Sequence, residues 1–411
     1  MQTFIREISG RGIRPGLERM RAGLETLGNP HLNMEIVLVA GTNGKGTVAK
    51  LVETMARSRG ARTFLFTSPH LVCLEERYRF DGVQIETQEL QACHRACLER
   101  LPRGETAHGF LTPFEWMTLV GFVAASQRNR DLWVLEVGLG GRLDSTNCVE
   151  PSVSVVTGIG LDHMDRLGPD HASIAAEKAG VFRNGVPAII GSSAAPWIQF
   201  SGARVEGVDF LVSSSDGAAF YRTGGDEVEL RGYEALPPSA RSNFAVACAA
   251  YEAWSKASGK ELSEALEAAT LSEWPGRCQS ISDSPLVLVD GAHNPDGASW
   301  LAAELCARFP ETRFHLLFGA KEGKDARGIL DALSPVVERV TLVSDVEGML
   351  LSAEDLEKSL GANSGSFGVA EDSLGALLET ASGPTLVAGS LFLVGEAIRA
   401  MGVQDSLVRL N

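Results

Sequence analysis

Short apolar runs alternate with amphipathic segments through most of the chain. Runs such as Ile36–Ala40 and Leu132–Val137 have the continuous apolar character of buried strands. Between such runs, apolar residues recur every three or four positions, as from Val48 to Met55, which is typical of amphipathic helices. Strands that alternate with helices build mostly parallel sheets covered on both faces. The pattern therefore predicts an α/β protein.

The first two thirds of the chain are expected to form one large α/β unit. A helical lead-in ends near residue 28, and the charged segment between Glu75 and Glu86 reads as a loop. Alternating polar and apolar residues between 200 and 231 predict a small antiparallel insert. Strands are expected at 36–40, 62–66, 132–137, 153–157 and 186–190, and helices after 47, near 87–101 and 113–127, through 174–181, and at 239–257 and 261–270.

The last part of the chain repeats the alternation more cleanly and predicts a doubly wound domain of its own. A chain of 411 residues exceeds what one hydrophobic core usually holds, so two domains are expected. We place them at 1–279 and 286–411, joined by a linker at 280–285. Strands are expected at 286–289, 314–318, 340–343 and 385–388, and helices at 295–308, 325–333, 353–360, 372–381 and after 392.

Composition excludes several classes of protein. The chain is 44% hydrophobic and 22% charged, as in ordinary globular proteins, and no apolar run reaches the ~18 residues of a membrane span. Its net charge of −15 disfavours nucleic-acid binding. The first residues lack the features of a signal peptide, and seven scattered cysteines indicate a reducing compartment, so a cytoplasmic location is expected. Cys93 and Cys97 are interpreted as packing thiols, because no second ligand pair for zinc follows them.

A glycine-rich turn, Gly41–Thr47, follows the first strand and precedes a helix. Glycines allow the backbone to approach an anion, the N–H groups at the start of a helix point toward it, and Lys45 adds a positive charge. The spacing is not that of a strict Walker A motif, because Gly46 separates Lys45 from Thr47. The turn is interpreted as a phosphate cradle, with an ordinary strand-to-helix turn as the alternative.

Polar side chains stand at the carboxyl ends of successive predicted strands: Ser68, Glu136 and His163. In open α/β sheets this edge is where ligands bind. Together with the hydroxyl of Thr47, these groups suit Mg²⁺, which prefers oxygen ligands and keeps water or phosphate in its shell. The histidine is the unusual member, and a structural histidine remains the alternative for it.

Two further residues, Lys178 and Asp290, can each be explained by a purely structural role when taken alone. Lys178 lies in the last turn of a predicted helix, where a cation is favourable, so Glu177 and Lys178 read as a helix-end charge pair. Asp290 directly follows the first strand of the second domain, where Asp-Gly serves either a ligand site or a simple turn.

Taken together, the motifs resemble the folylpolyglutamate synthase/dihydrofolate synthase family, relatives of the Mur ligases of cell-wall synthesis. The similarity spans nearly the whole chain, and its strings occur in the family's order, with the additional glycine of the phosphate turn included. They are Gly41–Thr47, Ser68–Leu71, Glu136–Asp144, Asp162–His163, Glu177–Gly180, Trp274–Arg277, Asp290–Pro295 and Gly389–Glu396.

The resemblance implies a P-loop-type ATPase domain with a mostly parallel sheet, followed by a Rossmann-like glutamate-ligase domain. It implies that the cradle residues bind ATP, with Lys45, His163 and Lys178 as catalytic residues. Two Mg²⁺ ions would be held by Thr47, Ser68, Glu136, His163 and a CO2-derived carbamate on Lys178, and K⁺ is a further candidate cation. The ATP-binding set comprises Thr42, Asn43, Gly44, Lys45, Gly46, Thr47, Asn243, Arg277 and Asp290.

The resemblance also implies a folate or pteroate pocket, whereas the glutamate-binding residues remain unassigned. Cys148 and Cys278 depart from the side chains expected at their positions, and the stretch Lys321–Asp325 differs slightly from the family's pattern. The pocket would be formed by Pro15, Gly16, Thr112, Pro113, Phe114, Glu115, Leu143, Asp144 and Ser145.

The implied activity is ATP-dependent ligation of L-glutamate to dihydropteroate, to the γ-carboxylate of folates, or to both, by a monomer that acts on small molecules alone. Two alternatives remain open at this point. One is a ligase acting on a cell-wall UDP-muramyl peptide, although the Lys-Gly-Thr turn and the Ser-Pro-His-Leu string favour the folate branch. The other is a nucleotide-binding switch that uses the same cradle.

Overall fold

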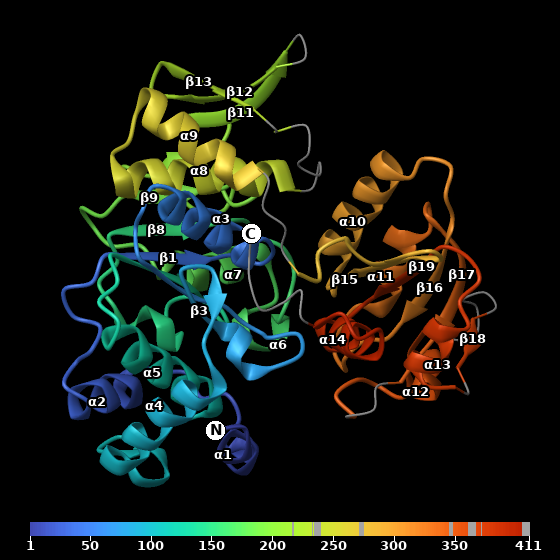
Figure 1. Ribbon diagram of the computed structural model, residues 1–411, viewed down its shortest axis with the longest axis horizontal. Helices are drawn as coiled ribbons and strands as arrows, with labels where there is room; N and C mark the ends of the chain where they lie inside the picture. The colour runs from blue at the N-terminus through green and yellow to red at the C-terminus, as the bar shows by residue number, and fades with distance from the viewer. Residues whose placement is uncertain are drawn as a thin grey trace.

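The computed structural model describes residues 1–215, 218–231, 233, 240–270, 275–344, 348–360, 367–370 and 372–404. It shows two α/β domains side by side (Figure 1). Each domain is built on its own sheet, which confirms the predicted fold class. Trp274 and residues 405–411 lie outside the described residues. No described helix is long and apolar enough to cross a membrane.

The N-terminal domain contains an eight-stranded sheet in the order β10-β9-β8-β1-β7-β2-β3-β4. The strands from β10 to β2 are parallel, and β3 and β4 extend the sheet in antiparallel pairing. Strand β1 lies near the middle, so its carboxyl end is surrounded by neighbouring strand ends. The bounds are β1 (Ile36–Ala40), β2 (Thr63–Phe66), β3 (Tyr78–Phe80), β4 (Val83–Gln84), β7 (Leu132–Glu136), β8 (Val153–Val156), β9 (Ala188–Ile190) and β10 (Arg204–Val205).

Helices cover both faces of this sheet because alternate strand residues point to opposite sides. Ile36, Leu38 and Ala40 of β1 join one hydrophobic cluster, whereas Val37 and Val39 join another. The first cluster includes residues of α2 (Glu18–Thr26), α4 (Thr87–Arg100), α5 (Pro113–Ser126) and α7 (His171–Ala179). The second includes residues of α3 (Lys45–Ser58), α8 (Arg241–Ser255) and α9 (Gly259–Thr270).

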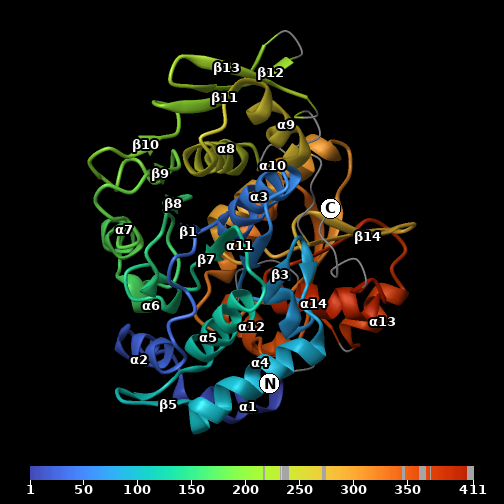
Figure 2. The same cartoon turned by 60° about the vertical axis from the view of Figure 1, so that its left-hand side comes forward.

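The predicted antiparallel insert is confirmed as three strands, β11 (Phe210–Ser215), β12 (Ala218–Thr223) and β13 (Asp226–Leu230). Figure 2 shows it at the outer end of the N-terminal domain, next to α8 and α9. The smaller elements of this domain are α1 (Gln2–Glu7), α6 (Met164–Leu167), the hairpin β5 (Glu105–Thr106) and β6 (Gly109–Phe110), and the 3₁₀ turns Ser9–Arg11, Leu74–Arg77, Pro102–Gly104 and Ser145–Cys148.

The C-terminal domain contains a six-stranded sheet in the order β14-β15-β19-β16-β17-β18. All its strands are parallel except β14, which forms an antiparallel edge. The strands are β14 (Gln279–Asp283), β15 (Leu286–Asp290), β16 (Phe314–Phe318), β17 (Val337–Leu342), β18 (Gly368–Val369) and β19 (Thr385–Ala388). The helices are α10 (Pro295–Arg308), α11 (Ala326–Leu333), α12 (Ala353–Leu360), α13 (Leu374–Glu379) and α14 (Leu391–Ala400).

Two segments expected as loops form strands instead. The charged stretch between Glu75 and Glu86 contains β3 and β4. Its charges predicted an exposed loop, but Glu76, Arg77 and Arg79 are buried. The predicted linker at 280–285 mostly belongs to β14, whose serines lie on an exposed sheet edge. The second sheet therefore begins at Gln279, before the predicted domain start at 286.

The two domains meet where a loop of the first packs against the hydrophobic core of the second. Leu71 and Val72 pack against the hydrophobic cluster of the C-terminal domain that includes Val394 of α14. Gly395 lies against the Leu71 backbone so closely that an added Cβ would come within 3.0 Å of the Leu71 carbonyl oxygen. Gly395 is therefore required by the contact between domains.

Gly395→Ala is expected to destabilise the protein by about 1–3 kcal/mol, because a methyl group at this position forces the domains apart. Alanine is otherwise favoured over glycine inside a helix, so a loss isolates the effect of the interface. Urea denaturation of both proteins measures the change. Gly383→Ala is the matched control, because a Cβ there meets no atom within 4 Å. Equal stability of the two variants would contradict this role for Gly395.

Candidate active site

The predicted phosphate cradle connects β1 to α3 in the structure. Gly44 is the N-cap of α3 and has a φ of 82°, a left-handed conformation that favours glycine. The side chain of Asn243, buried on α8, lies directly against Gly44, where an added Cβ would meet its amide. The structure thus brings Asn243, a nucleotide-binding residue by the family resemblance, to the turn.

Two lysine side chains converge on the carbonyl oxygen of Gly41. The Lys45 Nζ donates to it at 3.1 Å and also to the Thr42 carbonyl at 3.1 Å. The Nζ of Lys178, buried in the last turn of α7, donates to the same Gly41 oxygen at 2.8 Å. Lys178 therefore belongs to the phosphate turn, and the helix-end pairing with Glu177 does not describe it: Glu177 pairs with Arg142 at 2.6 Å.

The surroundings of Lys178 favour a neutral amine. Burial lowers its pKa to about 7, and the positive charge of Lys45 acts in the same direction. Burial also lowers the pKa of Lys45, although the carboxylates of Glu136 and Asp162 oppose this shift. Near neutral pH, a large share of Lys178 is consequently an unprotonated, nucleophilic amine, whereas Lys45 has carboxylates that stabilise its charge.

Glu136 ends β7 beside the cradle and is buried. Its Oε2 accepts a hydrogen bond from the Ser68 backbone N–H at 2.8 Å. Burial raises the pKa of Glu136, and the charge of Lys45 and this hydrogen bond oppose the rise. Gly46, Ser68 and Glu136 line one cavity, which Arg277, two residues before β14, and Leu391 of α14 complete.

The donor set at this cavity fits Mg²⁺. The carboxylate of Glu136 and the hydroxyl of Ser68 are oxygen donors, and Thr47 lies on the first turn of α3. Within the described ranges, His, Cys, Asp and Glu form no group of three or more that could hold a metal by itself. Such a site leaves coordination positions for phosphate oxygens and water, as Mg²⁺ prefers.

His163 lies apart on the loop after β8, with a left-handed φ of 51° and a side chain that is 46% exposed. Partial burial lowers its pKa to about 4, the nearby Asp162 charge opposes this, and Lys324 and His293 favour it. The imidazole is therefore neutral at physiological pH, which is the form that binds metal.

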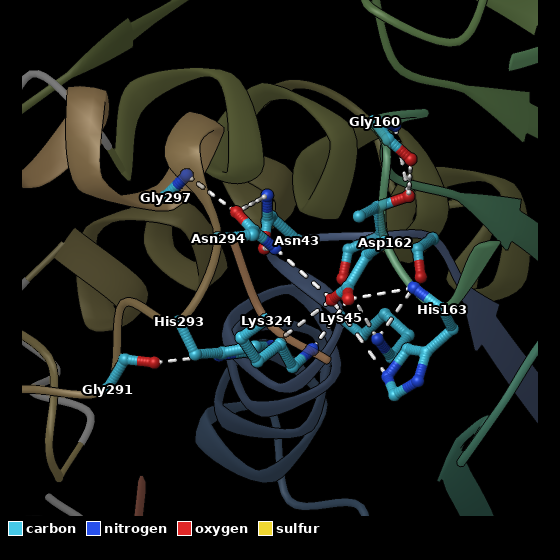
Figure 3. Close-up of polar contacts among 12 residues, drawn as sticks. Asn43, Lys45, Gly160, Asp162, His163, Gly291, His293, Asn294, Gly297 and Lys324 are labelled. Atoms are coloured by element: carbon cyan, nitrogen blue, oxygen red, sulfur yellow. Dashed lines mark hydrogen bonds and ion pairs between the residues drawn. The ribbon is translucent and has the colours of Figure 1, made fainter. Parts of the chain in front are cut away.

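Asp162, next to His163, joins the two domains (Figure 3). Its Oδ1 lies 2.5 Å from the Nζ of Lys324, and its Oδ2 lies 3.3 Å from the Nε2 of His293. Asn294 donates to the same Oδ2 at 3.3 Å. Burial would raise the pKa of Asp162, but the hydrogen bond from His293 and the adjacent charges hold it well below its ordinary range. The carboxylate is thus ionised and bound from the C-terminal domain.

A second contact between the domains lies on the cradle itself. The amides of Asn43 and Asn294 exchange hydrogen bonds of 3.2 and 3.1 Å. Asn294 also caps α10 by accepting from the Gly297 N–H at 2.8 Å. The Asp-Gly-Ala-His-Asn-Pro string after β15 therefore docks directly on the glycine-rich turn. Asp162, His293, Asn294 and Lys324 had no assigned role in the sequence. The first three lie in strings that carried the resemblance, whereas Lys324 lies in the stretch that departs from the family's pattern.

The other predicted nucleotide residues lie near this junction. Asp290 ends β15 and is buried, and it accepts backbone hydrogen bonds from Cys278 at 2.8 Å and Ala292 at 2.7 Å. Burial raises its pKa, and Arg277 opposes the rise. The side chain of Thr42 connects the cradle to the loop after β8: its hydroxyl donates to the Gly160 carbonyl at 3.1 Å and accepts from the Gly160 N–H at 3.0 Å.

The structure also brings together most of the predicted folate-side residues. Thr112 caps α5 in a capping box with Glu115, and Phe114 lies against Gly138 of the second glycine-rich loop. The hydroxyls of Thr118 and Ser145 are 2.8 Å apart. Pro15 is exposed and Gly16 half-buried just before α2.

Asp144 and Leu143 belong to the same second loop. Asp144 is buried, and its carboxylate accepts from the Leu139 N–H at 2.9 Å and from the Thr146 hydroxyl at 2.7 Å. The Asp144 side chain therefore organises this loop, while Leu143 is half-buried beside it.

A parallel-sheet nucleotide domain that is docked through its cradle onto a second α/β domain defines the Mur ligase class. The Mur ligase middle domain matches residues 39–201, and the Mur ligase glutamate ligase domain matches residues 276–395. The dihydrofolate synthase/folylpolyglutamate synthase of Escherichia coli K12 is 35% identical, over 98% of this chain and 95% of its own length. That of Bacillus subtilis is 29% identical, over 94% of both chains.

The solved structures that are similar to this protein belong to the same family as these relatives. E. coli FolC in complex with ADP superposes with a TM-score of 0.84 at 32% identity, covering 98% of both chains. A bifunctional folylpolyglutamate synthase/dihydrofolate synthase with Mn, AMPPNP and L-glutamate bound gives a TM-score of 0.83 at 31% identity, again over 98% of both chains. The chain belongs to the dihydrofolate synthase/folylpolyglutamate synthase family.

Proposed function

We propose that this protein is an ATP-dependent ligase that joins the amine of L-glutamate to the carboxylate of dihydropteroate, to the γ-carboxylate of a (tetrahydro)folate, or to both. One observation carries the proposal: Gly46, Ser68 and Glu136 share a cavity, at the start of the cradle helix, with Arg277, which falls within the matched glutamate ligase domain at 276–395. A phosphate bound at the start of this helix would therefore lie at the contact between the two domains. Relatives named for both synthase activities support the folate branch over a cell-wall substrate.

The reaction proceeds in two steps, activation of the carboxylate by phosphoryl transfer and attack by the glutamate amine. A carboxylate oxygen of the pteroate or folate attacks the γ-phosphorus of ATP, and the bond between that phosphorus and the β-phosphate oxygen breaks. ADP departs, and the product is an acyl phosphate. The glutamate amine then attacks the acyl carbon and loses a proton, and inorganic phosphate leaves with the original carboxylate oxygen. The first step needs little covalent participation from the protein, so positioning and charge neutralisation provide most of the catalysis.

The residues of the cavity supply that positioning. The backbone N–H groups at the start of α3 and the Lys45 ammonium hold the phosphates, and Arg277 approaches from the C-terminal domain. Glu136, Ser68 and Thr47 would hold one Mg²⁺, and His163 with a carbamylated Lys178 a second; bound there, Mg²⁺ neutralises phosphate charge. K⁺ remains a further candidate.

Lys178 is proposed to carry a carbamate. A neutral lysine amine reacts with CO2 and releases a proton, which converts an ammonium site into a carboxylate-like anion. The buried position of Lys178, its pKa of about 7 and its place beside Lys45 support this modification. An anion there would also attract the ammonium of Lys45, with which Lys178 shares the Gly41 carbonyl.

Contact between the domains excludes water from the acyl phosphate. Lys324 contributes through its ion pair with Asp162, in which the side chains are only 15% and 10% exposed. Lys324→Met is expected to lower kcat/KM for glutamate about tenfold and to raise ATP hydrolysis without ligation. Coupled ADP-release and ligation assays measure both effects.

Lys358→Met is the matched control for Lys324→Met, because the pair of Lys358 with Asp355 lies on the surface, 74% and 59% exposed. Exposed pairs contribute little. Unchanged coupling in Lys324→Met would remove Lys324 from the mechanism.

The test of the proposed function offers dihydropteroate and tetrahydrofolate separately, each with ATP and labelled glutamate, and counts the residues added to each. Addition to both substrates is expected. ATP turnover indifferent to folate and glutamate would instead favour a nucleotide switch, and turnover only with a UDP-muramyl peptide would favour the cell-wall branch. The enzyme is proposed to act as a cytoplasmic monomer without nucleic-acid or membrane partners, consistent with its net charge of −15.

A further inference from the structure

The segment between the first helix and α2 is fastened at both ends to the residues that lead into α5. We call residues 12–17 the N-terminal strap. Before the strap, the Arg11 guanidinium donates to the carbonyls of Leu111 at 2.8 Å and Arg103 at 2.9 Å. After the strap, the Arg19 guanidinium donates to the Glu115 carboxylate at 3.2 and 2.8 Å. Two arginines thus fix one short segment to the start of α5.

The ion pair between Arg19 and Glu115 is largely buried. Its side chains are 13% and 6% exposed, and Arg19 also donates to the carbonyl of Arg14 inside the strap at 2.5 Å. Glu115 has a second partner, because its Oε2 accepts from the Thr112 N–H at 2.7 Å. A two-pronged, charge-assisted contact of this kind specifies orientation as well as energy. Arg19 therefore orients the strap and the turn from Thr112 to Glu115 together.

This turn is connected to the reaction centre. Phe114, between Thr112 and Glu115, lies so close to Gly138 that an added Cβ there would come within 3.0 Å of its ring. Gly138 follows Glu136, the buried carboxylate of the proposed metal site, by two residues. A displacement of Glu115 would move Phe114 against the loop that carries the end of β7.

Two glycines shape the backbone of the strap. Gly12 and Gly16 have φ values of 63° and 130°, conformations that favour glycine, and they bracket Ile13, which is 58% exposed. The strap therefore holds its shape through glycine conformations and the two arginine contacts, and Leu17 at its end is its one buried side chain.

We propose that Arg19 is a positioning residue for the pteroate-type substrate, holding the strap and the Phe114 turn as one wall of its site. This inference rests on the proposed function, because it names the side of the site that receives the non-nucleotide substrate. Arg19 itself need not touch the substrate: it acts through Glu115 and Arg14, which it holds in place.

Arg19→Gln is expected to raise the KM for dihydropteroate about tenfold or more, while the KM for ATP and the kcat at saturation change less than twofold. Arg19→Lys keeps the charge but loses the fork, and is expected to recover part of the affinity. Arg21→Gln, an exposed arginine on the same helix, is the matched control and should behave as wild type. Initial rates with each substrate varied in turn provide the measurements.

Glu115→Gln provides the second variant, in case Arg19→Gln folds poorly, and it should raise the same KM. The double variant Arg19→Gln with Glu115→Gln should be no worse than either single change if the two groups act as a pair. A wild-type protein that ligates neither dihydropteroate nor tetrahydrofolate would refute the proposed function itself. An active wild type whose Arg19→Gln and Glu115→Gln variants lose thermal stability but keep the dihydropteroate KM would overturn the positioning role alone.

Discussion

Lys45→Ala is expected to lower the kcat for glutamate-dependent ADP release by a factor of about a hundred to a thousand. The Nζ of Lys45 lies at the start of the cradle, between the Gly41 and Thr42 carbonyls, where its charge faces any phosphate held by the turn. Alanine removes the charge that stabilises the transferring phosphoryl group while leaving the backbone N–H groups of α3 in place. Steady-state ADP release with dihydropteroate and glutamate measures the effect.

The loss should lie mainly in kcat, because a charge that stabilises the transition state is worth more there than in the bound ground state. Lys358→Ala is the control, since that lysine is 74% exposed and pairs only at the surface. A Lys45→Ala protein with full glutamate-dependent turnover would show that the cradle does not bind the reacting phosphates.

Lys178→Ala is expected to lower turnover about a hundredfold, and added acetate should restore part of it. The carbamate proposed on Lys178 is a carboxylate-like anion, and acetate can occupy the space that alanine leaves. Lys178→Arg keeps a cation that cannot react with CO2, so acetate should not rescue it. Measuring turnover of both variants across acetate concentrations separates the two cases.

The same proposal predicts a dependence on pH. Burial lowers the pKa of Lys178 to about 7, so the neutral amine is the minor form below that value and the major form above it. At a fixed concentration of dissolved CO2, carbamate occupancy should therefore rise as pH increases through about 7. Mass spectrometry under native conditions measures the fraction of the protein whose mass has increased by one CO2. A Lys178→Arg enzyme with wild-type turnover would refute the carbamate.

The continuous apolar strands were predictable because burial on both faces leaves a plain signal. β1, β7 and β8 have no exposed residue, and their predicted ranges differ from the structure by at most one residue at either end. β3 and β14 were missed for opposite reasons. β3 buries Arg79, a charged residue that patterns assign to the surface, whereas β14 is a serine-rich edge strand with little to bury.

The candidate site was predictable as far as single residues at strand ends and turns allow. Glu136 lies at the cradle as its strand end predicts. Asn243 and Lys178, which were assigned to the site only through the family resemblance, lie there too, and Lys178 meets Lys45 at one carbonyl. Contacts between domains could not be read in this way, because they depend on how the two units dock. The bridge from Asp162 to Lys324 joins residues 162 positions apart, and no local periodicity records it.

Arg19 shows the same limit at shorter range. Its partner Glu115 lies 96 positions away on another helix, and the residue reads in sequence as an ordinary helix-surface cation. Glu115 was expected to contact the substrate, yet both its oxygens have protein partners, so it organises the turn around Phe114. Side chains named by a motif can thus support a site without lining it.

The most direct test of the proposed reaction follows one oxygen atom. Dihydropteroate labelled with heavy oxygen in its carboxylate is incubated with the enzyme, ATP and glutamate, and the released phosphate is analysed by mass spectrometry. An acyl phosphate intermediate predicts one heavy oxygen in each phosphate, because the carboxylate oxygen that attacks ATP leaves with the phosphoryl group. Ligation that releases only unlabelled phosphate would contradict activation of the carboxylate by phosphoryl transfer.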